Sequence, residues 1–152
     1  MDRIAAVALG SNLGDRRANL DDAVHRLRDL LMNLTVSSYR DTEPVGVSGP
    51  QPRYLNAAAV GTTRLAARDL LGALLGIERD RGRERPYVNA PRTLDLDVIL
   101  LGGEVVDEPG LTVPHPRFRE RLFVLQPLVE IAPDLIDPVT QLTVAELLAR
   151  CR

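Results

Sequence analysis

Lysine and tryptophan are absent from this 152-residue sequence, and cysteine occurs once. All 19 basic side chains are therefore arginine, so the lysine of a Walker-type phosphate loop is missing and that class of nucleotide site is excluded. Arginine suits phosphate oxygens, but a GC-rich genome would produce the same bias. The lone Cys151 cannot form an internal disulfide, which indicates a reducing compartment, and we expect a cytoplasmic protein.

Long apolar runs are also missing. After two charged residues the N-terminus has only six apolar positions, Ile4 to Leu9, which are too few for a secretory signal or a membrane span. The formal net charge of −2 argues against a general nucleic-acid binder. The composition, 45% hydrophobic and 26% charged, is that of a globular protein, and we expect one monomeric domain over residues 1–152.

The hydrophobic pattern predicts an α+β fold. Expected strands cover 4–9, 34–39, 54–62 and 95–101, and expected helices cover 16–32, a segment with apolar residues at 67–75, and two short stretches near 122–131 and 143–150. The order βαββαβ is typical of a ferredoxin-like antiparallel sheet with helices on its faces, followed here by a C-terminal extension. Asn12 or Asp15 is the expected N-cap of the first helix, and the Gly10–Gly14 turn is interpreted as structural.

Asp95 and Asp97 are the sharpest chemical feature. Alternate residues of a strand share a face, so the two carboxylates project together from a strand that is otherwise apolar. Carboxylates at such a position are costly to desolvate unless something positive compensates. A magnesium ion that also binds substrate phosphates would do so, but solvation at the strand end or pairing with arginines would explain the pair equally well.

Arginines are concentrated just before this pair. Five lie in a Gly/Pro-containing stretch: Arg79, Arg81, Arg83, Arg85 and Arg92. Arginines beside paired carboxylates are what metal-assisted polyphosphate transfer requires, which favours a site over a merely solvated surface. Glu78 continues the apolar stripe of the second helix, so it faces the core edge and needs a donor, either a ribose hydroxyl or a neighbouring arginine.

Other side chains suit a planar ligand and a phosphate. Tyr54 and Asn56 share a strand face, where a ring could stack and an amide could read a heterocycle edge. Phe123 could add a second ring, or it could pack in the core beside Leu122 and Leu125. His115, held between two prolines, could donate to a phosphate or cap a turn.

Together these motifs resemble the 6-hydroxymethyl-7,8-dihydropterin pyrophosphokinase family. The resemblance runs from residue 4 to about residue 135, and its most specific stretch is Pro91-Arg-Thr-Leu-Asp-Leu-Asp97. The other matching stretches are Leu9-Gly-Ser-Asn-Leu-Gly14, Tyr54-Leu-Asn-Ala-Ala58, Ile77-Glu78, Gly82-Arg83, Leu111-Thr-Val-Pro-His115, and Arg121 with Phe123.

The resemblance implies transfer of diphosphate from ATP to the hydroxymethyl group of the pterin, with AMP released, as a step of folate biosynthesis. It implies two Mg²⁺ ions on Asp95 and Asp97, and catalytic roles for Arg83, Arg92 and Asp97. The implied ATP contacts are Glu78, Arg85, Arg92, Thr112, His115 and Arg121. The implied pterin contacts are Tyr54 and Phe123, stacked on the ring, with Asn56, Thr42 and the backbone near Val45 at its edge.

The chain departs from the family pattern at three places. Asn89 and Ala90 stand where a Trp-Gly pair is common, and Tyr87 is a candidate for the missing aromatic contact. Gly110 replaces a basic residue, and Pro116 replaces an aromatic or polar one. These differences bear on ATP affinity rather than on the reaction.

Two other function classes remain open from the residues alone. A ferredoxin-like sheet with an Asp-x-Asp pair also occurs in nucleotidyl-transferring palms, although this chain offers no basic track for a nucleic acid. The same fold also serves non-catalytic sensing of small molecules. The products formed from ATP would distinguish all three.

Overall fold

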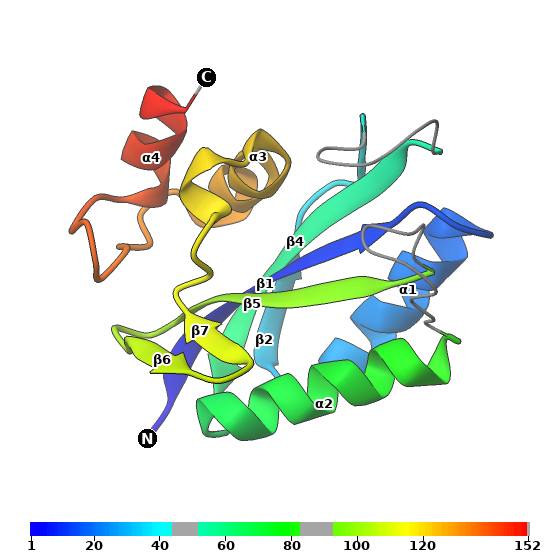
Figure 1. The fold of residues 1–152 in the computed structure, drawn as a ribbon, viewed down its shortest axis with the longest axis horizontal. Coiled ribbons are helices and arrows are strands. Elements are labelled where there is room, and N and C mark those ends of the chain that lie inside the picture. Colours follow the sequence, from blue (N-terminus) through cyan, green and yellow to red (C-terminus); the bar gives the residue numbers. More distant parts are fainter. Residues whose placement is uncertain (44–51, 83–92, 152) are drawn as a thin grey trace.

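An antiparallel sheet forms the centre of the molecule (Figure 1). This computed structural model describes residues 1–43, 52–82 and 93–151. The strands run in the order β2-β4-β1-β5, and a short strand, β3, also pairs with β4. Their bounds are β1 Arg3–Ser11, β2 Met32–Val36, β3 Arg40–Thr42, β4 Tyr54–Thr63 and β5 Asp95–Leu101.

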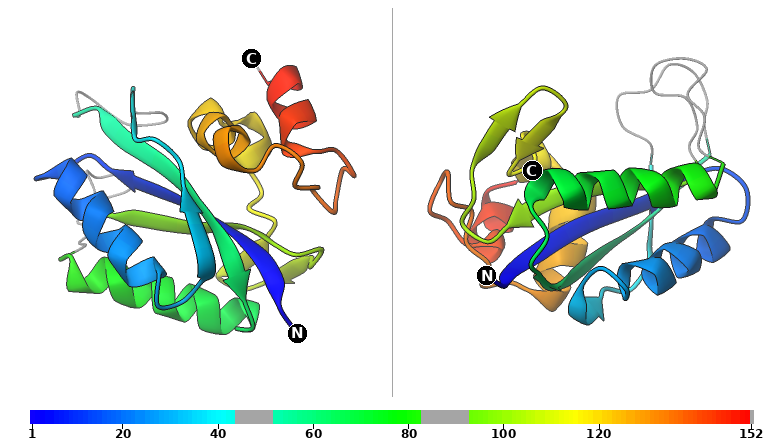
Figure 2. Two further views of the ribbon diagram at one scale, coloured as in Figure 1. Left: turned by 180° about the vertical axis from the view of Figure 1, so that it is seen from behind. Right: turned by 90° about the horizontal axis from the view of Figure 1, so that it is seen from below.

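Helices cover both faces of the sheet. α1 (Arg16–Leu27) and α2 (Ala67–Asp80) lie on one face, and α3 (Leu122–Ile131) and α4 (Val144–Arg150) lie over the other, as Figure 2 shows from two further directions. A small hairpin, β6 (Val106–Glu108) with β7 (Leu111–Val113), and a 3₁₀ turn, η1 (Phe118–Glu120), connect β5 to α3. In the described parts of the chain, no helix has the length and apolar character needed to cross a bilayer.

Strand alternation divides the interior into two cores. One face of β1 contributes Ala5, Val7 and Leu9 to the core under α1 and α2. Its other face presents Ala6 and Ala8 to the core formed with α3 and α4. On that face α3 packs on β4, and the end of the face near Gly10 carries the polar residues described below.

The element predictions are largely confirmed, as is the mixed architecture of helices and antiparallel sheet. β5 and α3 have the expected bounds, and Asp15 is the N-cap of α1, accepting a hydrogen bond from the Ala18 N–H at 3.1 Å. α1 was expected to continue to residue 32 but ends at Leu27, because the next apolar residues, Leu30 and Leu31, form a turn whose N–H groups donate to the Leu27 carbonyl.

The predicted bounds of the second strand were also wrong. It covers Met32–Val36 rather than 34–39, with a positive φ of 54° at Asn33 and an irregular register opposite β4. The short strands β3, β6 and β7 were not predicted, because three-residue strands carry too few alternations to show a period. Gly10 belongs to β1 rather than to the turn that follows it.

Candidate functional site

A row of paired residues crosses three strands at one end of the sheet. Gly10 of β1 pairs with Asn56 of β4 on one side and with Asp95 of β5 on the other. Directly paired residues face the same side, so the side chains of Asn56 and Asp95 share the face that carries α3. Strands are spaced by about 4.8 Å, which places the two backbones about 10 Å apart.

The acidic pair occupies the β5 end of this row. Asp95 and Asp97 are half-buried, and the residues that alternate with them, Leu96 and Val98, are buried in the core under α2. The prediction that both carboxylates project from one face is therefore confirmed. Two oxygen-bearing ligands one strand step apart fit Mg²⁺, which takes few protein ligands and completes its shell with phosphates and water. Among the described residues, no group of three or more His, Cys, Asp or Glu side chains is arranged to hold a metal ion.

His115 lies beside β5, within electrostatic reach of Asp95. Its backbone N–H donates to the Ile99 carbonyl at 3.0 Å, which fastens the segment before η1 to the strand. Burial lowers the pKa of His115, and the positive charges of Arg121 and Arg117 lower it further, while Asp95 acts in the opposite direction. The imidazole is therefore neutral at pH 7, and its Nδ1 accepts the Arg117 N–H at 3.2 Å. An accepting Nδ1 leaves the proton on Nε2, so the ring can donate from that atom.

Arg121 and Phe123 come from the start of α3. Arg121 is the N-cap residue of the helix, and its guanidinium carbon lies 5.5 Å from the centre of the Phe123 ring. Phe123 is half-buried and packs against the core on the α3 face. The Phe123 ring therefore packs in the core and keeps part of its surface exposed, where a ligand could stack. The Arg121 guanidinium over the ring limits its orientation.

The β4 end of the row holds Tyr54, Asn56 and, from β3, Thr42. Asn56 is only 6% exposed and donates from Nδ2 to the hydroxyl of Thr42, and Thr42 pairs with Tyr54 in register. A Cβ atom at residue 10 would lie 3.0 Å from Asn56 Oδ1 and 3.4 Å from Tyr54 Cδ1. The amide and the phenol ring therefore lie over the bare backbone of Gly10, a role that the structural interpretation of the Gly10–Gly14 turn missed.

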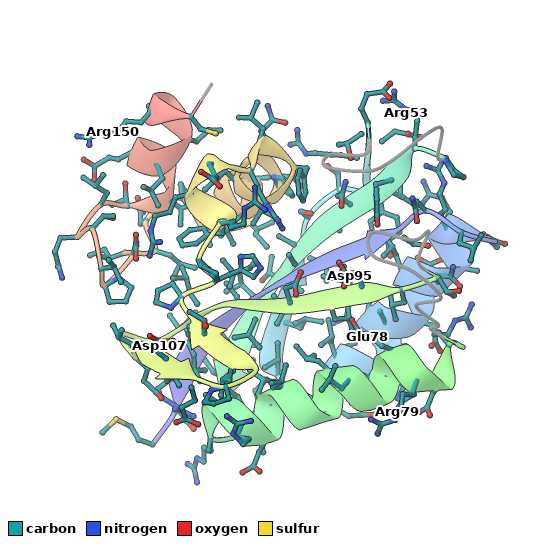
Figure 3. The ribbon with its side chains drawn as sticks, viewed as in Figure 1. Arg53, Glu78, Arg79, Asp95, Asp107 and Arg150 are labelled. Carbon is teal, nitrogen blue, oxygen red and sulfur yellow. The ribbon has the colours of Figure 1, made fainter. Side chains whose placement is uncertain are left out.

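Glu78 comes from α2 and lies on the side of β5 opposite to Asp95 (Figure 3). It is 1% exposed, and its carboxylate accepts the backbone N–H of Leu96 at 2.7 Å. The expectation that Glu78 faces the core edge and needs a donor is confirmed, with a peptide N–H as one donor. Its contact with ATP stays a prediction.

The remaining predicted residues are placed as follows. Thr112 is exposed in β7, where it pairs with Asp107. Val45, Arg83, Arg85 and Arg92 lie outside the described residues, so their roles stay predictions. The structure therefore brings together Tyr54, Asn56, Thr42, Asp95, Asp97, His115, Arg121 and Phe123 on one face and one end of the sheet.

Comparison with known proteins identifies the family. Residues 6–133 match the family model described as 7,8-dihydro-6-hydroxymethylpterin-pyrophosphokinase (HPPK). The chain belongs to the HPPK family. This match covers every site residue that lies in the described part of the chain.

Relatives of similar length support the HPPK assignment. The chain is 44% identical over 148 residues to the 2-amino-4-hydroxy-6-hydroxymethyldihydropteridine pyrophosphokinase of Pseudomonas aeruginosa, covering 95% of this chain and 90% of that protein. It is 45% identical over 142 residues to the enzyme of the same name from Bacillus subtilis, covering 92% of this chain and 84% of that one.

Longer relatives contain an HPPK-like part. The mitochondrial folate synthesis bifunctional protein of Pisum sativum is 40% identical over 140 residues, which are 91% of this chain and 27% of that protein. Among solved structures, a Plasmodium falciparum HPPK-DHPS chain superposes with a TM-score of 0.79 at 15% identity, over 99% of this chain. This chain spans 45% of that fused protein, and at such low identity the likeness supports the fold alone.

Proposed function

We propose that this HPPK-family chain transfers diphosphate from ATP to the hydroxymethyl group of 6-hydroxymethyl-7,8-dihydropterin and releases AMP, a step of folate biosynthesis. The family and its named relatives support the reaction. The observation that carries the proposal for this chain is the row from Asn56 through Gly10 to Asp95. It places the side chains proposed to read the heterocycle and the carboxylates proposed to hold the metal ions of the nucleotide about 10 Å apart, backbone to backbone, on one sheet, so that two substrates could meet between them.

The β4 end of the row would bind the pterin. Tyr54 and Phe123 would stack on the ring from strand and helix, while Asn56 and Thr42 would read the donors and acceptors at its edge, aided by the backbone near Val45. Because Asn56 donates to Thr42, its carbonyl oxygen is directed to the side of Gly10 and is fixed as an acceptor for a ring N–H. A bound ring would hold its hydroxymethyl group toward β5.

The β5 end would bind the triphosphate. Asp95 and Asp97 would hold two Mg²⁺ ions, which when bound neutralise phosphate charge and orient the β-phosphate. Arg83 and Arg92 would stabilise the charge that develops during transfer, and Asp97 is the third residue to which we assign a catalytic role. The other ATP contacts would be Glu78, Arg85, Thr112, His115 and Arg121.

The neutral state of His115 suits this role. Its Nε2–H can donate to a phosphate oxygen without adding a charge that would repel the neighbouring arginine. Arg121 adds the cation that a phosphate needs, and its contact with Phe123 links the two halves of the site.

We further propose that residues 1–152 form one monomeric domain of the ferredoxin-like class, acting in the cytoplasm. The element order supports the class, because without the short β3 it is βαββαβ with a β2-β4-β1-β5 antiparallel sheet. The unpaired Cys151 supports a reducing compartment.

The direct test is to incubate the protein with ATP and the hydroxymethyl-dihydropterin and to identify the products. The proposal predicts AMP and a pterin diphosphate, dependent on added Mg²⁺. Pyrophosphate as product would indicate a nucleotidyl transferase, and binding without turnover would indicate a sensor. Asp97→Asn should lower turnover by about 10²–10⁵-fold, while Asp107→Asn, an exposed carboxylate of the β6–β7 hairpin, should leave it unchanged.

A further inference from the structure

The side chain of Asn19 connects α1 to three other segments of the chain, at residues 11–13, 81 and 93. It lies in the second turn of α1 and is only 3% exposed. Its side-chain nitrogen donates to Ser11 Oγ at 3.1 Å, at the end of β1, and to the Leu13 carbonyl at 3.0 Å. The same nitrogen donates to the Thr93 carbonyl at 3.0 Å, two residues before Asp95. Since the amide has two hydrogens and three acceptors, one hydrogen is shared between two of them.

The other atom of the amide has a different partner. Asn19 Oδ1 accepts hydrogen bonds from Nε and Nη2 of Arg81, just after the end of α2. Asn19 therefore binds the chain on both borders of the stretch 83–92, at Arg81 and at Thr93. Every polar atom of this buried amide is used, as burial demands.

The Thr93 contact is the one that bears on chemistry. Between Thr93 and Asp95 lies only Leu94, which is 0% exposed and thus anchored in the core. Directly after Asp95, the Leu96 N–H is held by Glu78. The start of β5 is therefore fastened by Asn19 before the first aspartate and by Glu78 after it. A residue step in a strand is about 3.3 Å, so Thr93 lies about 7 Å along the chain from Asp95, and the hydrogen bond at its carbonyl helps to fix where β5 begins.

We propose that Asn19 is a positioning residue for the acidic pair, acting through the Thr93 carbonyl. This role for Asn19 rests on one part of the proposed function, namely that Asp95 and Asp97 bind the metal–nucleotide complex. Asn19 itself lies on the α1 side of the sheet, the face opposite to the side chains of Asn56 and Asp95. Its loss should loosen the start of β5 while leaving the pterin end, which is built from β3 and β4, in place.

The variants distinguish the contacts of the Asn19 side-chain nitrogen from those of its oxygen. Asn19→Asp keeps an acceptor for Arg81 but replaces the nitrogen that donates to Thr93, and also to Ser11 and Leu13, with an oxygen. Arg81→Gln removes the guanidinium and leaves the contact between Asn19 and Thr93. Asn19→Ser is a smaller change, for use if the aspartate variant fails to fold. Thr63→Val is the control for destabilisation, because this buried hydroxyl, which accepts the Leu65 N–H, lies at the opposite end of β4.

Two measurements are made on folded protein. The first is calorimetric binding of a non-hydrolysable ATP analogue over a range of Mg²⁺ concentrations. We expect Asn19→Asp and Asn19→Ser to require about tenfold more Mg²⁺ for the same analogue affinity. The second is steady-state kinetics, in which kcat should fall roughly ten- to a hundredfold, since displacements near 1 Å have effects of that order. The KM for the pterin should change less than threefold, and Arg81→Gln and Thr63→Val should change Mg²⁺ dependence little.

Opposite results would overturn the inference. If both Asn19 variants are less stable but keep the wild-type Mg²⁺ dependence and kcat, the amide is merely structural. If Arg81→Gln matches them, the Arg81 contact rather than Thr93 carries the effect. A wild-type protein that binds the analogue with Mg²⁺ but forms no AMP would contradict the proposed function alone, and the binding experiment would still decide the role of Asn19.

Discussion

Asn56 and Asp95 stand in one row of the sheet, each paired with Gly10 of β1. The two substrate-binding ends of the proposed site are thus related by hydrogen-bonded strands and not by loops. Strand spacing in a sheet varies little. We therefore expect the sheet itself to set the distance between bound pterin and bound phosphate. Gly10, in the middle of the row, becomes important because a side chain there would meet Asn56 and Tyr54.

Gly10→Ala should impair pterin binding. The new methyl group would lie 3.0 Å from Asn56 Oδ1, so this side chain must shift from the position in which it would contact the ring, while Tyr54 Cδ1 at 3.4 Å is at the limit of ordinary contact. Overpacking of this kind costs about 1–3 kcal/mol. We expect the Kd of the pterin to rise about tenfold or more, measured by calorimetry, while binding of the ATP analogue changes little.

Gly72→Ala is the matched control for this substitution. A Cβ at this exposed position of α2 meets nothing within 4 Å, and alanine is the better helix former by about 0.5–1 kcal/mol. The variant should be slightly more stable and bind pterin as the wild type does. Equal pterin affinity in Gly10→Ala would show that the row tolerates a side chain and that Gly10 is not needed for the site.

The sequence was sufficient for the local relationships in this site. The period of a strand alone places Asp95 with Asp97, and Tyr54 with Asn56, because alternation depends only on neighbouring residues. The apolar stripe of α2 likewise places Glu78 at the edge of the core. The long-range relationships were not accessible, because nothing in the spacing of the sequence states that Asn56 and Asp95 are both paired with the same glycine.

The clearest omission is Asn19. Its helical position suggests a polar residue near a helix start, and its partners Arg81 and Thr93 lie more than 60 residues away. Only the tertiary fold reveals that one amide serves them both. Glu130 was also overlooked, since a glutamate near the end of a helix is ordinarily solvated.

Glu130 should tune pterin binding from outside the site. Its carboxylate accepts the N–H and the hydroxyl of Ser38, each at 2.7 Å, and Nη2 of Arg40 at 3.0 Å, which ties α3 to β3. These hydrogen bonds, those from Ser38 first, lower the pKa of Glu130. The contact joins α3, which carries Phe123 two helical turns away, to β3, which carries Thr42. We expect Glu130→Ala to weaken pterin binding roughly three- to tenfold, less than the loss of about 1.5–3 kcal/mol for a hydrogen bond to a charged group, because the contact would act on the ring only through α3 and β3.

The control for Glu130 is another glutamate paired with arginine. Glu108 contacts Arg68 at 2.8 Å on the β6–β7 hairpin, and both side chains are more than half exposed. Glu108→Ala removes a comparable surface pair, worth at most about 1 kcal/mol, without touching α3 or β3. Should both variants bind pterin equally well, the contact between α3 and β3 would have no part in shaping the site.

His115 should titrate below the ordinary histidine pKa of 6.5. Burial lowers its pKa first, and Arg121 adds to the effect. NMR titration of the imidazole nitrogens should show this, and Arg121→Gln should raise the pKa of His115 because one repelling cation is removed. Since the folded protein binds this proton more weakly than the unfolded chain, the His115 contribution to stability is complete above about pH 6.5 and declines on acidification. A pKa at or above 6.5 would contradict the buried, neutral imidazole.

Asp137 should be a main source of acid-sensitive stability in the C-terminal part of the fold. Burial alone would raise its pKa, but hydrogen bonds from Arg119, from the Thr140 hydroxyl at 2.7 Å and from the Val139 N–H at 3.0 Å hold the pKa at about 2. The carboxylate is 0% exposed, and its bidentate contact with Arg119 ties η1 to the segment between α3 and α4. Removing one partner of a buried pair costs about 3–5 kcal/mol.

We therefore expect Asp137→Asn to lower the free energy of unfolding at pH 7 by about 3 kcal/mol, near the lower end of that range because Arg119 is partly exposed. Urea unfolding would measure it, with Asp134→Asn, an exposed neighbour, as the control. Because the folded pKa lies below the unfolded value of 3.8, the stabilisation is present above pH 3.8 and is lost as the pH falls toward 2. The difference between wild type and variant should shrink over that interval, and a difference that stayed constant down to pH 2 would mean that packing, not the carboxylate charge, stabilises this segment.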